Sequence, residues 1–450
     1  MPPPNITGKL HIGHSLFLTI QDSLARYYRK SGYDTNWIAG LDHAGIATHE
    51  KIIERLPNSY SNDDYDLKAN EIKNEHGSKI TEQIKKMGAS CDWNNLHYTL
   101  NDNFKTAAFE ALKKLNEENL IYEDSGNIYI KMKGMANKLL KNIKNNKFII
   151  NDITQLNKLI YTLENIEDWC ISRQIRWGLE MPLYFKDNKM LISKNPESNY
   201  LHCGYTFDTW FTSSLYPLAI LNWNTEDDSL YKEYYPTQII ETGYDILFPW
   251  CARMLMMCEF LTGEYPFKEI YLHGICRDKY GRKMSKSLGN FFTIRGIFEK
   301  SKYSESVTAE CLRYLFLSTH YRSDLSFSDK AIEEAKSALD NIYGLIQRLE
   351  ESDTQESIQG DEDWDRILRD FANKFQDGMD DDFNTPKVLG AFHALRGEVN
   401  KLLTKGLSEK IRKNVLEGLR QYGRPLGLFQ LGTNQWNAIV VKLEPAVVQA

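Results

Sequence analysis

Cysteine is scarce in this 450-residue sequence, and its seven copies never form a Cys-x-x-Cys pair. Zinc ribbons and dithiol redox sites depend on such pairs, so neither is indicated. Cys203 follows His202 and could suggest a metal ligand, but a chance neighbour is the better interpretation. We therefore expect no protein-bound zinc.

Long apolar runs are also missing, and so is a recognisable signal peptide. A membrane span needs a run of about 20 apolar residues, so no membrane partner is expected. The net charge of −6 excludes a globally basic surface, so any nucleic acid must be bound by local patches. We expect a soluble, cytoplasmic protein of roughly two to four domains.

The first fifty residues carry the most distinctive pattern. Residues 2–5, Pro-Pro-Pro-Asn, cannot lie inside a helix or a central strand, because proline donates no backbone hydrogen bond. From Gly13 the apolar spacing is helical, and Ser31-Gly32 ends the helix. The residues on its apolar face are Leu16, Ile20, Leu24 and Tyr27. A short buried strand at 36–39 completes a predicted β-turn-α-β unit.

His11 and His14 stand at the N-terminus of this predicted helix, three residues apart and on one face. Free backbone N–H groups and the helix dipole favour an anion there, and two imidazoles can bind the same anion. Taken alone, the pair also fits a metal pair or plain surface histidines.

A second motif, Gly-Arg-Lys-Met-Ser-Lys-Ser-Leu-Gly, occupies residues 281–289. Lys283 and Lys286 lie three apart, with hydroxyls between them and glycines on both sides. This composition suits a loop that brings positive charge to a phosphate. An ordinary basic surface turn is the alternative when the motif is taken alone.

Together, His-Ile-Gly-His at 11–14 and Lys-Met-Ser-Lys-Ser at 283–287 resemble the signature pair of class I aminoacyl-tRNA synthetases. Residues 1–282 resemble valyl-tRNA synthetase, and residues 283–430 resemble cysteinyl-tRNA synthetase. The valyl-like motifs occupy residues 2–5, 42–48, 88–93, 169–174, 208–211 and 242–246. The cysteinyl-like motifs occupy residues 288–295, 312–315, 320–323 and 379–386.

The fold class that this resemblance implies is α/β: a doubly wound parallel, Rossmann-like nucleotide-binding domain, followed by an all-α helical bundle. Strands are expected at 127–130, 238–242 and 270–273, with an apolar helix at 246–261 and mostly helix over 50–120. The predicted parts are 1–120 (first half of the catalytic domain), 121–165 (shortened connective insert), 166–298 (second half with the lysine loop), 299–335 (stem-contact-like connection) and 336–450 (helical tRNA anticodon-binding bundle). The editing domain that valyl enzymes carry between the two halves is expected to be absent.

Three charged stretches need an interpretation. Residues 131–147 are rich in lysine and fit a solvated helix face better than a patch on tRNA phosphates. The acidic residues 350–365 predict a loop between helices. Residues 380–382, three aspartates, are expected to cap the helix after Pro386 rather than to bind a metal.

The reaction that the resemblance implies is amino acid activation by ATP to the aminoacyl-adenylate, followed by transfer to tRNA, with Mg²⁺ on the nucleotide phosphates. The implied catalytic residues are His11, His14, Lys283 and Lys286. The implied ATP-binding residues are Gly13, Gly243, Asp245, His273, Gly274, Ser285 and Ser287. The implied amino-acid-binding residues are Pro2, Pro3, Asn5, Asp42, Trp177, Thr206 and Trp210.

Valine is the amino acid that the resemblance favours, but three positions depart from the valyl pattern. Arg176, Leu179 and Thr206 stand where the family usually has Trp, His and an aliphatic residue. A hydroxyl at position 206 could favour a more polar amino acid. Valyl-tRNA synthetase is itself the known case in which a hydrophobic pocket rejects threonine by only about a hundredfold, so editing normally supplies the rest.

Two other functions stay open from the sequence. One is a synthetase-derived paralogue that ligates an activated amino acid to a non-tRNA acceptor. The other is a non-catalytic tRNA-binding module, against which the intact histidine and lysine motifs argue. A monomer is expected. In the family a strand precedes the Pro-Pro-Pro-Asn turn, so either a strand lies upstream or the sheet lacks it.

Overall fold

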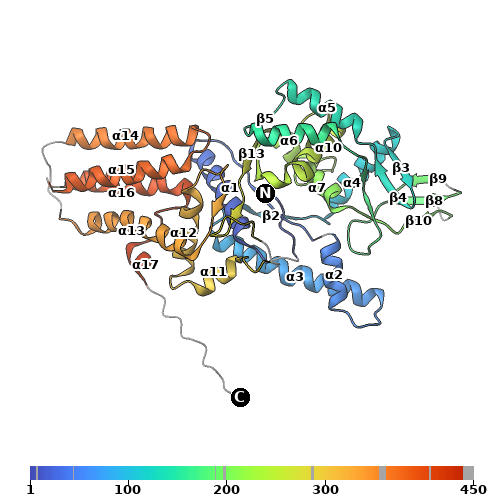
Figure 1. The fold of residues 1–450 in the computed structure, drawn as a ribbon, viewed down its shortest axis with the longest axis horizontal. Coiled ribbons are helices and arrows are strands. Elements are labelled where there is room, and N and C mark those ends of the chain that lie inside the picture. The colour runs from blue at the N-terminus through green and yellow to red at the C-terminus, as the bar shows by residue number, and fades with distance from the viewer. Residues whose placement is uncertain are drawn as a thin grey trace, which may run out of the picture. The chain divides into compact units, whose positions relative to one another are not determined.

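The computed structural model describes residues 1–6, 9–43, 45–187, 189–195, 199–284, 288–353, 361–404 and 407–438 (Figure 1). The chain divides into two compact units, and each is described by itself. The first unit comprises Met1–Gly8, Ile38–Ile80 and Asp92–Leu272, and the second comprises Lys9–Trp37, Thr81–Cys91 and His273–Ala450. None of the helices in these described ranges is both long and apolar enough to cross a membrane.

Parallel strand pairs form the framework of the first unit. β1 (Ile38–Leu41) pairs with β2 (Asp92–Tyr98), and β13 (Phe267–His273) pairs with β5 (Ile149–Ile150). β12 (Thr237–Gly243) lies on the other side of β13. All four residues of β1 are buried, as in parallel strands covered on both faces.

Helices cover these strands. In chain order they are α2 (Ile46–Glu54), α3 (Asn62–Lys86), α4 (Asp102–Glu117), α5 (Lys133–Lys144), α6 (Ile153–Glu164), α7 (Thr209–Ser214), α8 (Tyr216–Ala219), α9 (Ser229–Tyr234) and α10 (Arg253–Thr262). α10 is apolar on nearly every side and buries Met254, Leu255 and Cys258. A helix of this kind belongs in the centre of a core.

Antiparallel strands make up the rest of this unit. β3 (Ile121–Asp124), β4 (Asn127–Ile130) and β6 (Trp169–Cys170) form one sheet. β8 (Leu183–Lys186), β9 (Lys189–Ile192) and β10 (Leu201–His202) form a second, and β7 (Ser172–Arg173) pairs with β11 (Thr206–Phe207). The chain between β4 and β6 holds α5, β5 and α6, which occupy the predicted connective insert.

The second unit joins the first long helix to the C-terminal bundle. Its elements are α1 (Ile12–Lys30), β14 (Cys276–Arg277), α11 (Ile294–Lys300), α12 (Glu305–Leu317), β15 (Leu325–Ser326), α13 (Asp329–Glu351), α14 (Asp361–Asp380), α15 (Thr385–Leu403), α16 (Glu409–Gly423), the 3₁₀ turn η3 (Arg424–Leu426) and α17 (Thr433–Asn437). Helices α13 to α16 pack side by side in the orange and red part of Figure 1. The predicted α/β class with a C-terminal helical bundle is therefore confirmed.

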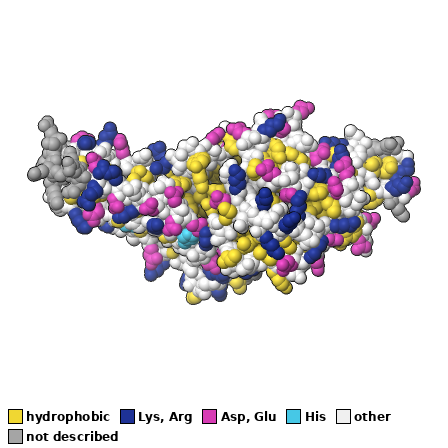
Figure 2. Space-filling model, turned by 90° about the horizontal axis from the view of Figure 1, so that it is seen from above, with side chains coloured by type: hydrophobic (Ala, Val, Ile, Leu, Met, Phe, Trp, Pro, Cys, Tyr) yellow, Lys and Arg dark blue, Asp and Glu magenta, His cyan; other side chains and the backbone are white. Residues whose placement is uncertain are grey.

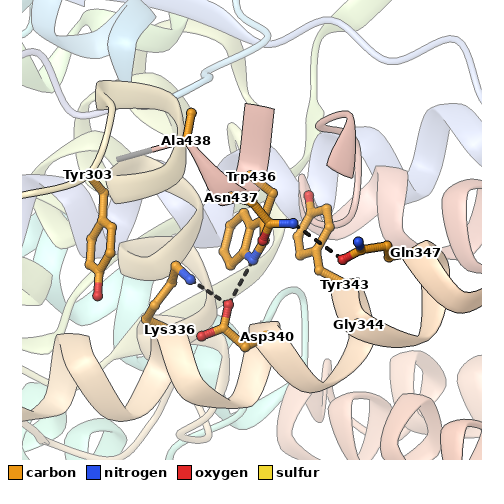
Figure 3. A pocket seen from close by; sticks show the side chains of 9 residues that line it. All are labelled: Tyr303, Lys336, Asp340, Tyr343, Gly344, Gln347, Trp436, Asn437 and Ala438. Carbon is orange, nitrogen blue, oxygen red and sulfur yellow. Dashed lines mark hydrogen bonds and ion pairs between the residues drawn. The ribbon is translucent and has the colours of Figure 1, made fainter. Parts of the chain in front are cut away.

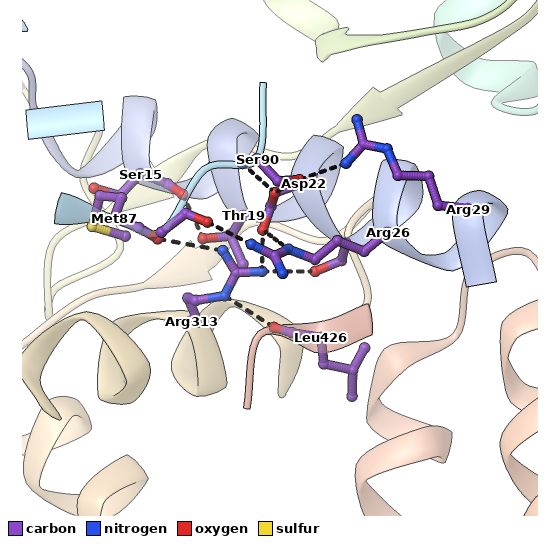
Figure 4. A network of polar contacts seen from close by, with 11 residues as sticks. Ser15, Thr19, Asp22, Arg26, Arg29, Met87, Ser90, Arg313 and Leu426 are labelled. Carbon is purple, nitrogen blue, oxygen red and sulfur yellow. Dashed lines mark hydrogen bonds and ion pairs between the residues drawn. The ribbon is translucent and has the colours of Figure 1, made fainter. Parts of the chain in front are cut away.

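A buried ion pair ties several elements of the second unit together (Figure 4). The Asp22 carboxylate on α1 is fully buried and lies 2.7 Å from both Arg313 of α12 and Arg26. Ser90 donates to it from backbone and hydroxyl at 2.8 and 2.6 Å, and Arg313 also donates to the Leu426 carbonyl at 2.9 Å. Burial alone would raise the pKa of Asp22, but the two arginines and Ser90 outweigh it and lower the pKa.

One prediction in this unit is wrong. The helix after Pro386 is capped by Asn384, whose side chain accepts from the Lys387 N–H at 3.2 Å, and not by the aspartates at 380–382. Asn384 has this role because it stands directly before the first helical residue. The aspartates bind elsewhere: Asp380 accepts from Tyr27 at 2.9 Å, and Asp382 pairs with Arg322.

The apolar helix predicted at 246–261 exists, but it starts differently. A 3₁₀ turn η1 (Tyr244–Ile246) and a π-helix η2 (Leu247–Ala252) precede α10. Pro249 lies in this stretch and cannot donate the hydrogen bond of a regular α-helix, which explains the irregular start. β2, inside the region expected to be mostly helical, was not predicted.

A cavity of about 380 Å³ lies between α13 and α17 (Figure 3). Its polar side chains bind one another: Asp340 accepts from Lys336 and from the Trp436 ring at 2.8 Å. The Trp436 ring also stacks on Tyr343, with ring centroids 4.0 Å apart. These contacts fasten α17 to the bundle.

Charges of both signs are interspersed on the face shown in Figure 2. In the lysine-rich helix α5, Lys138 pairs with Glu259 at 2.5 Å, and Lys133 donates to the Glu164 carbonyl. The six lysines at 131–147 are exposed, as expected for a solvated helix face.

Candidate active site

The histidines of the first motif form the N-terminal cap of α1. His11 Nδ1 accepts from the Gly13 N–H at 3.1 Å, and His14 Nδ1 accepts from the His11 N–H at 3.2 Å. The two ring centroids lie 3.8 Å apart. An Nδ1 atom that accepts carries no proton, so each neutral ring holds its proton on Nε2. Both rings can therefore offer an Nε2–H donor at a helix N-terminus.

His14 acts as a neutral donor. Burial and the neighbouring His11 lower the pKa of His14 to about 3, so the ring is uncharged near pH 7. A Cβ on Gly13 would lie 3.0 Å from the His11 ring, so a residue larger than glycine would crowd that ring. Positive charge at this site must therefore come from residues other than His14.

The segment that follows the lysine motif lies against this cap. The Ile12 N–H donates to the Phe292 carbonyl at 3.1 Å, and the Ile294 N–H donates to the Leu10 carbonyl at 3.0 Å. The His11 ring packs on Phe291 with centroids 5.0 Å apart. The structure thus joins the first motif to the segment that follows the second. Lys283 belongs to the described stem of the loop, while Ser285, Lys286 and Ser287 lie outside the described residues.

Two predicted nucleotide residues also belong to the second unit. His273 is buried, and the Gly274 N–H donates to the Tyr321 carbonyl at 2.8 Å. A Cβ on Gly274 would meet the Ser323 carbonyl oxygen at 2.4 Å, so only glycine fits there. Gly243 and Asp245 belong to the first unit, where Gly243 ends β12 and Asp245 lies in the 3₁₀ turn that follows.

Several of the predicted amino-acid-binding residues lie together in the first unit. The Asp42 side chain is buried and accepts from the Thr99 hydroxyl at 2.8 Å. Its backbone pairs with the start of the chain, because the Asp42 N–H donates to Pro4 and the Ile6 N–H donates to Asp42, at 3.0 and 2.9 Å. This pairing brings Asn5 opposite Asp42 and places the segment containing Pro2 and Pro3 beside them.

The other predicted amino-acid-binding residues, Trp177, Thr206 and Trp210, lie in the same unit. The Trp177 ring donates to the His43 carbonyl, next to Asp42. Thr206 is 2% exposed, and its hydroxyl lies 3.4 Å from the carbonyls of Arg173 and Ile175. Trp210 is 37% exposed, so it is not part of the buried core.

Close packing joins these pieces. A Cβ on Gly178 would lie 2.9 Å from Thr206 Cβ, and a Cβ on Gly45 would lie 2.4 Å from the Thr209 hydroxyl. Gly45 also has a φ of +95°, which favours glycine. The structure therefore brings the 42–45 turn, Trp177 and the 206–210 segment together within the first unit.

The unusual residues at 176 and 179 face different surroundings. Arg176 pairs with Asp66 of α3 at 2.9 Å, and its guanidinium lies 5.1 Å from the centre of the Tyr65 ring. Leu179 is buried, and its carbonyl accepts from the Phe207 N–H at 2.8 Å. Arg176 thus fastens α3 to the segment that carries Trp177.

Sequence reasoning missed Thr99, His43 and Asp278. Thr99 supports Asp42 across 57 positions of sequence, and nothing local signals that contact. His43 is 2% exposed, and burial, with Lys73 nearby, lowers its pKa to about 3. Asp278 precedes the lysine motif by a few residues, and its closeness to the motif was the available signal.

The family model for tRNA synthetases class I (I, L, M and V) matches residues 1–129, 125–203 and 189–328. The chain belongs to this family. A DALR domain model also matches residues 374–430, within the C-terminal bundle of this class I family member.

Curated relatives of this family member include two valine–tRNA ligases. The chloroplastic/mitochondrial 2 enzyme of Arabidopsis thaliana is 26% identical over 506 residues, covering 64% of this chain and 51% of the relative. The enzyme of Carboxydothermus hydrogenoformans is 26% identical over 546 residues, covering 76% and 61%. The chain thus spans about half to three-fifths of the length of these relatives.

Solved structures agree on the fold. A leucyl-tRNA synthetase of Agrobacterium radiobacter K84, in ternary complex with tRNA and LeuAMS, has a TM-score of 0.74 at 14% identity, covering 94% of this chain and 83% of that one. Methionyl-tRNA synthetase of Mycobacterium tuberculosis, bound by methionyl-adenylate, has a TM-score of 0.71 at 17% identity, covering 95% and 94%.

Proposed function

We propose that this chain is an aminoacyl-tRNA ligase that activates valine with ATP, passes it to tRNA, and has no editing domain. The observation that carries the proposal is the cap of α1, where His11 and His14 accept through Nδ1, so that each neutral ring carries its proton on Nε2. Such a pair at a helix N-terminus fits the phosphates of a nucleotide. Membership of the class I family supports the same reaction.

In the proposed reaction the amino acid carboxylate attacks the α-phosphate of ATP, and pyrophosphate leaves. Negative charge shifts to the phosphate oxygens, where the Nε2–H groups of His11 and His14 would donate and Lys283 and Lys286 would supply charge. Asp42 would pair with the substrate ammonium. Gly13, Gly243, Asp245, His273 and Gly274, with Ser285 and Ser287, complete the proposed nucleotide site.

The donor set suits an anion better than a resident metal. In the described ranges no group of three or more His, Cys, Asp or Glu side chains could hold a metal ion. Mg²⁺ commonly binds substrate phosphates and keeps several waters. It would accordingly arrive with ATP and neutralise phosphate charge there.

Valine is supported by the surroundings of Thr206. The hydroxyl has a single proton, and two backbone carbonyls lie within 3.4 Å of it. A hydroxyl that donates its proton to the backbone is less available to a polar substrate. Thr206 therefore resembles a valine both in shape and in the methyl group that it presents to the substrate. Trp177 and Trp210 would form the walls around the substrate side chain.

The absence of an editing domain is supported in two ways. Between β4 and β6 the chain holds only α5, β5 and α6, within the 121–165 insert. The alignment with the Arabidopsis enzyme runs over 506 positions but uses only 64% of this 450-residue chain, as expected if the relative carries a segment that this chain lacks. Without editing, threonine would be activated at about a hundredth of the efficiency of valine.

A tRNA partner is supported by the C-terminal bundle. The DALR match lies on α14 to α16 and the turn after them. We assign residues 336–450 to tRNA binding, 299–335 to the stem-contact connection, and 1–120 and 166–298 to the two catalytic halves. We further propose that the enzyme acts as a monomer in the cytoplasm.

The test is amino-acid-dependent exchange of pyrophosphate into ATP, run with each of the twenty amino acids. Valine should support exchange, and His14→Ala should abolish it, whereas the matched control His202→Ala on β10 should behave like wild type. Exchange with a different amino acid would overturn the valine assignment. Exchange without charging of bulk tRNA would favour a ligase with another acceptor, and no exchange at all would favour a non-catalytic binding module.

A further inference from the structure

Asp278 organises the stem of the lysine loop. Its side chain is buried directly after β14, although the residues around it are mostly charged. One carboxylate oxygen accepts from the Tyr280 and Arg282 N–H groups, both at 2.9 Å. The other accepts from the Arg282 guanidinium at 2.8 Å. A single carboxylate therefore closes the turn that leads into Lys283.

Asn290 reaches the same carboxylate from the far end of the loop. Its amide donates to Asp278 Oδ2 at 2.9 Å and lies 3.4 Å from the Lys283 carbonyl. The amide carries two protons, so it can serve both acceptors at once. The two ends of the segment from Lys283 to Asn290 are thus held together across its base.

Both sides of this base are fastened to larger elements. On one side, β14 pairs with β15, and Arg277 binds Asp324 at 2.6 Å. On the other side, the residues directly after Asn290 pair with the start of α1, through the Ile12 N–H and the Phe292 carbonyl. The base of the lysine loop is therefore tied to the helix that carries His11 and His14.

The electrostatics agree with this geometry. The Asn290 amide, the Arg282 side chain and the turn N–H groups outweigh burial and hold the pKa of Asp278 well below its usual range. The carboxylate is therefore ionised and accepts from each of these donors. The backbone N–H groups of Tyr280 and Arg282 and the Arg282 side chain are enough to form the turn. The hydrogen bond from Asn290 is not needed for the turn, so it must have another role.

We propose that Asp278 and Asn290 are positioning residues that place Lys283 relative to the two histidines during adenylate formation. This inference rests on the proposed function. Positioning errors of about 1 Å can cost a hundredfold in rate. The contact between Asp278 and Asn290 is called the clamp below. The predicted amino acid site depends on Asp42 and Trp177 in the first unit, so binding of the amino acid should not depend on the clamp.

The main test is Asn290→Ala, assayed by valine-dependent pyrophosphate exchange. It removes the bridge and keeps the turn between Asp278 and Arg282. We expect kcat to fall about tenfold to a hundredfold, with the KM for valine within about twofold of wild type. Glu299→Gln, which removes the carboxylate of an exposed pair with Arg295, is the control and should leave kcat unchanged.

A swapped pair separates positioning from folding. Asn290→Asp alone puts two carboxylates together and should be the worst variant. Asn290→Asp combined with Asp278→Asn restores an amide–carboxylate contact across the base, so it should recover part of the lost kcat. Unchanged kcat in Asn290→Ala, or a loss that appears only in melting temperature, would overturn the proposal.

Failure of the proposed function gives a different result. If wild type supports no exchange with any amino acid, the reaction is wrong, and the clamp is then judged by tryptic cleavage after Arg282 and Lys283. Faster cleavage in Asn290→Ala than in Glu299→Gln supports a base that holds both ends of the loop. Equal cleavage in the two variants contradicts it.

Discussion

The buried pair of Asp22 and Arg313 gives the strongest stability prediction. Asp22→Asn keeps the shape of the side chain and removes its charge. Arg313, whose side chain is only 4% exposed, would then lose its ion-pair partner while it stays buried. Arg26, at 27% exposed, can turn towards water and needs no replacement partner. The perturbation therefore acts mainly on one buried guanidinium.

The expected cost follows from this burial. Removing one partner of a buried ion pair costs about 3–5 kcal/mol of unfolding free energy, because an uncompensated charge stays in the interior. For a unit of roughly 150–250 residues, each kcal/mol lowers the melting temperature by about 2–4 °C, so the fall should be roughly 6–20 °C. An exposed pair contributes about 0–1 kcal/mol.

The assay is thermal and urea unfolding of Asp22→Asn beside Asp370→Asn, which breaks an exposed pair with Lys374. Arg313→Met should be less damaging than Asp22→Asn, because Asp22 keeps its ion pair with Arg26 and its hydrogen bonds from Ser90. The double variant should lose less than the sum of the two, because it leaves no unpaired buried charge. If Asp22→Asn costs no more than Asp370→Asn, the pair does not hold the second unit together, and the reasoning fails.

Three other changes have defined outcomes. Gly274→Ala should lower stability and raise the KM for ATP, because the new Cβ meets the Ser323 carbonyl at 2.4 Å; unchanged melting and KM would contradict this. Asp42→Asn should raise the KM for valine in pyrophosphate exchange at least tenfold, since an amide lacks the charge that pairs with ammonium; a KM within twofold of wild type would count against that role. Burial raises the pKa of Glu310 to about 7, so the folded chain binds a proton more tightly than the unfolded one. The stability that this proton binding contributes is complete below the unfolded pKa and is lost as pH rises towards 7. Glu310→Gln should therefore flatten the fall of unfolding free energy between about pH 4.5 and 7. An unaltered slope would contradict the raised pKa of Glu310.

Local patterns predicted the elements that local chemistry determines. The helix expected from Gly13 to Ser31 exists as α1, and its expected face is buried. The strand expected at 238–242 exists as β12, and the strand at 127–130 as β4. In each case the spacing of apolar residues carries the information, and burial of one face follows from it.

Long-range pairing explains what the sequence did not reveal. β2 is rich in Asp and Asn and lacks an alternating pattern, and it is a strand because it pairs with β1. The role of Arg176 depends on Asp66 of α3, and that of Asn290 depends on Asp278. The motif pair pointed to the site, whereas the contacts that support Asp42 and Lys283 required the folded chain.

The pairing of α1 with the C-terminal half also matters during synthesis. Ser23 and Arg313, which contact each other in the folded unit, are 290 positions apart. A ribosome adding about 5–20 residues per second needs roughly 15–60 s to cover that distance. Throughout this interval the apolar face of α1 lacks α12 and η3, and the Asp22 carboxylate has Arg26 but not Arg313. The nascent chain should therefore depend on chaperones until α12 and η3 emerge, and a fragment ending at Leu272 should aggregate through α1.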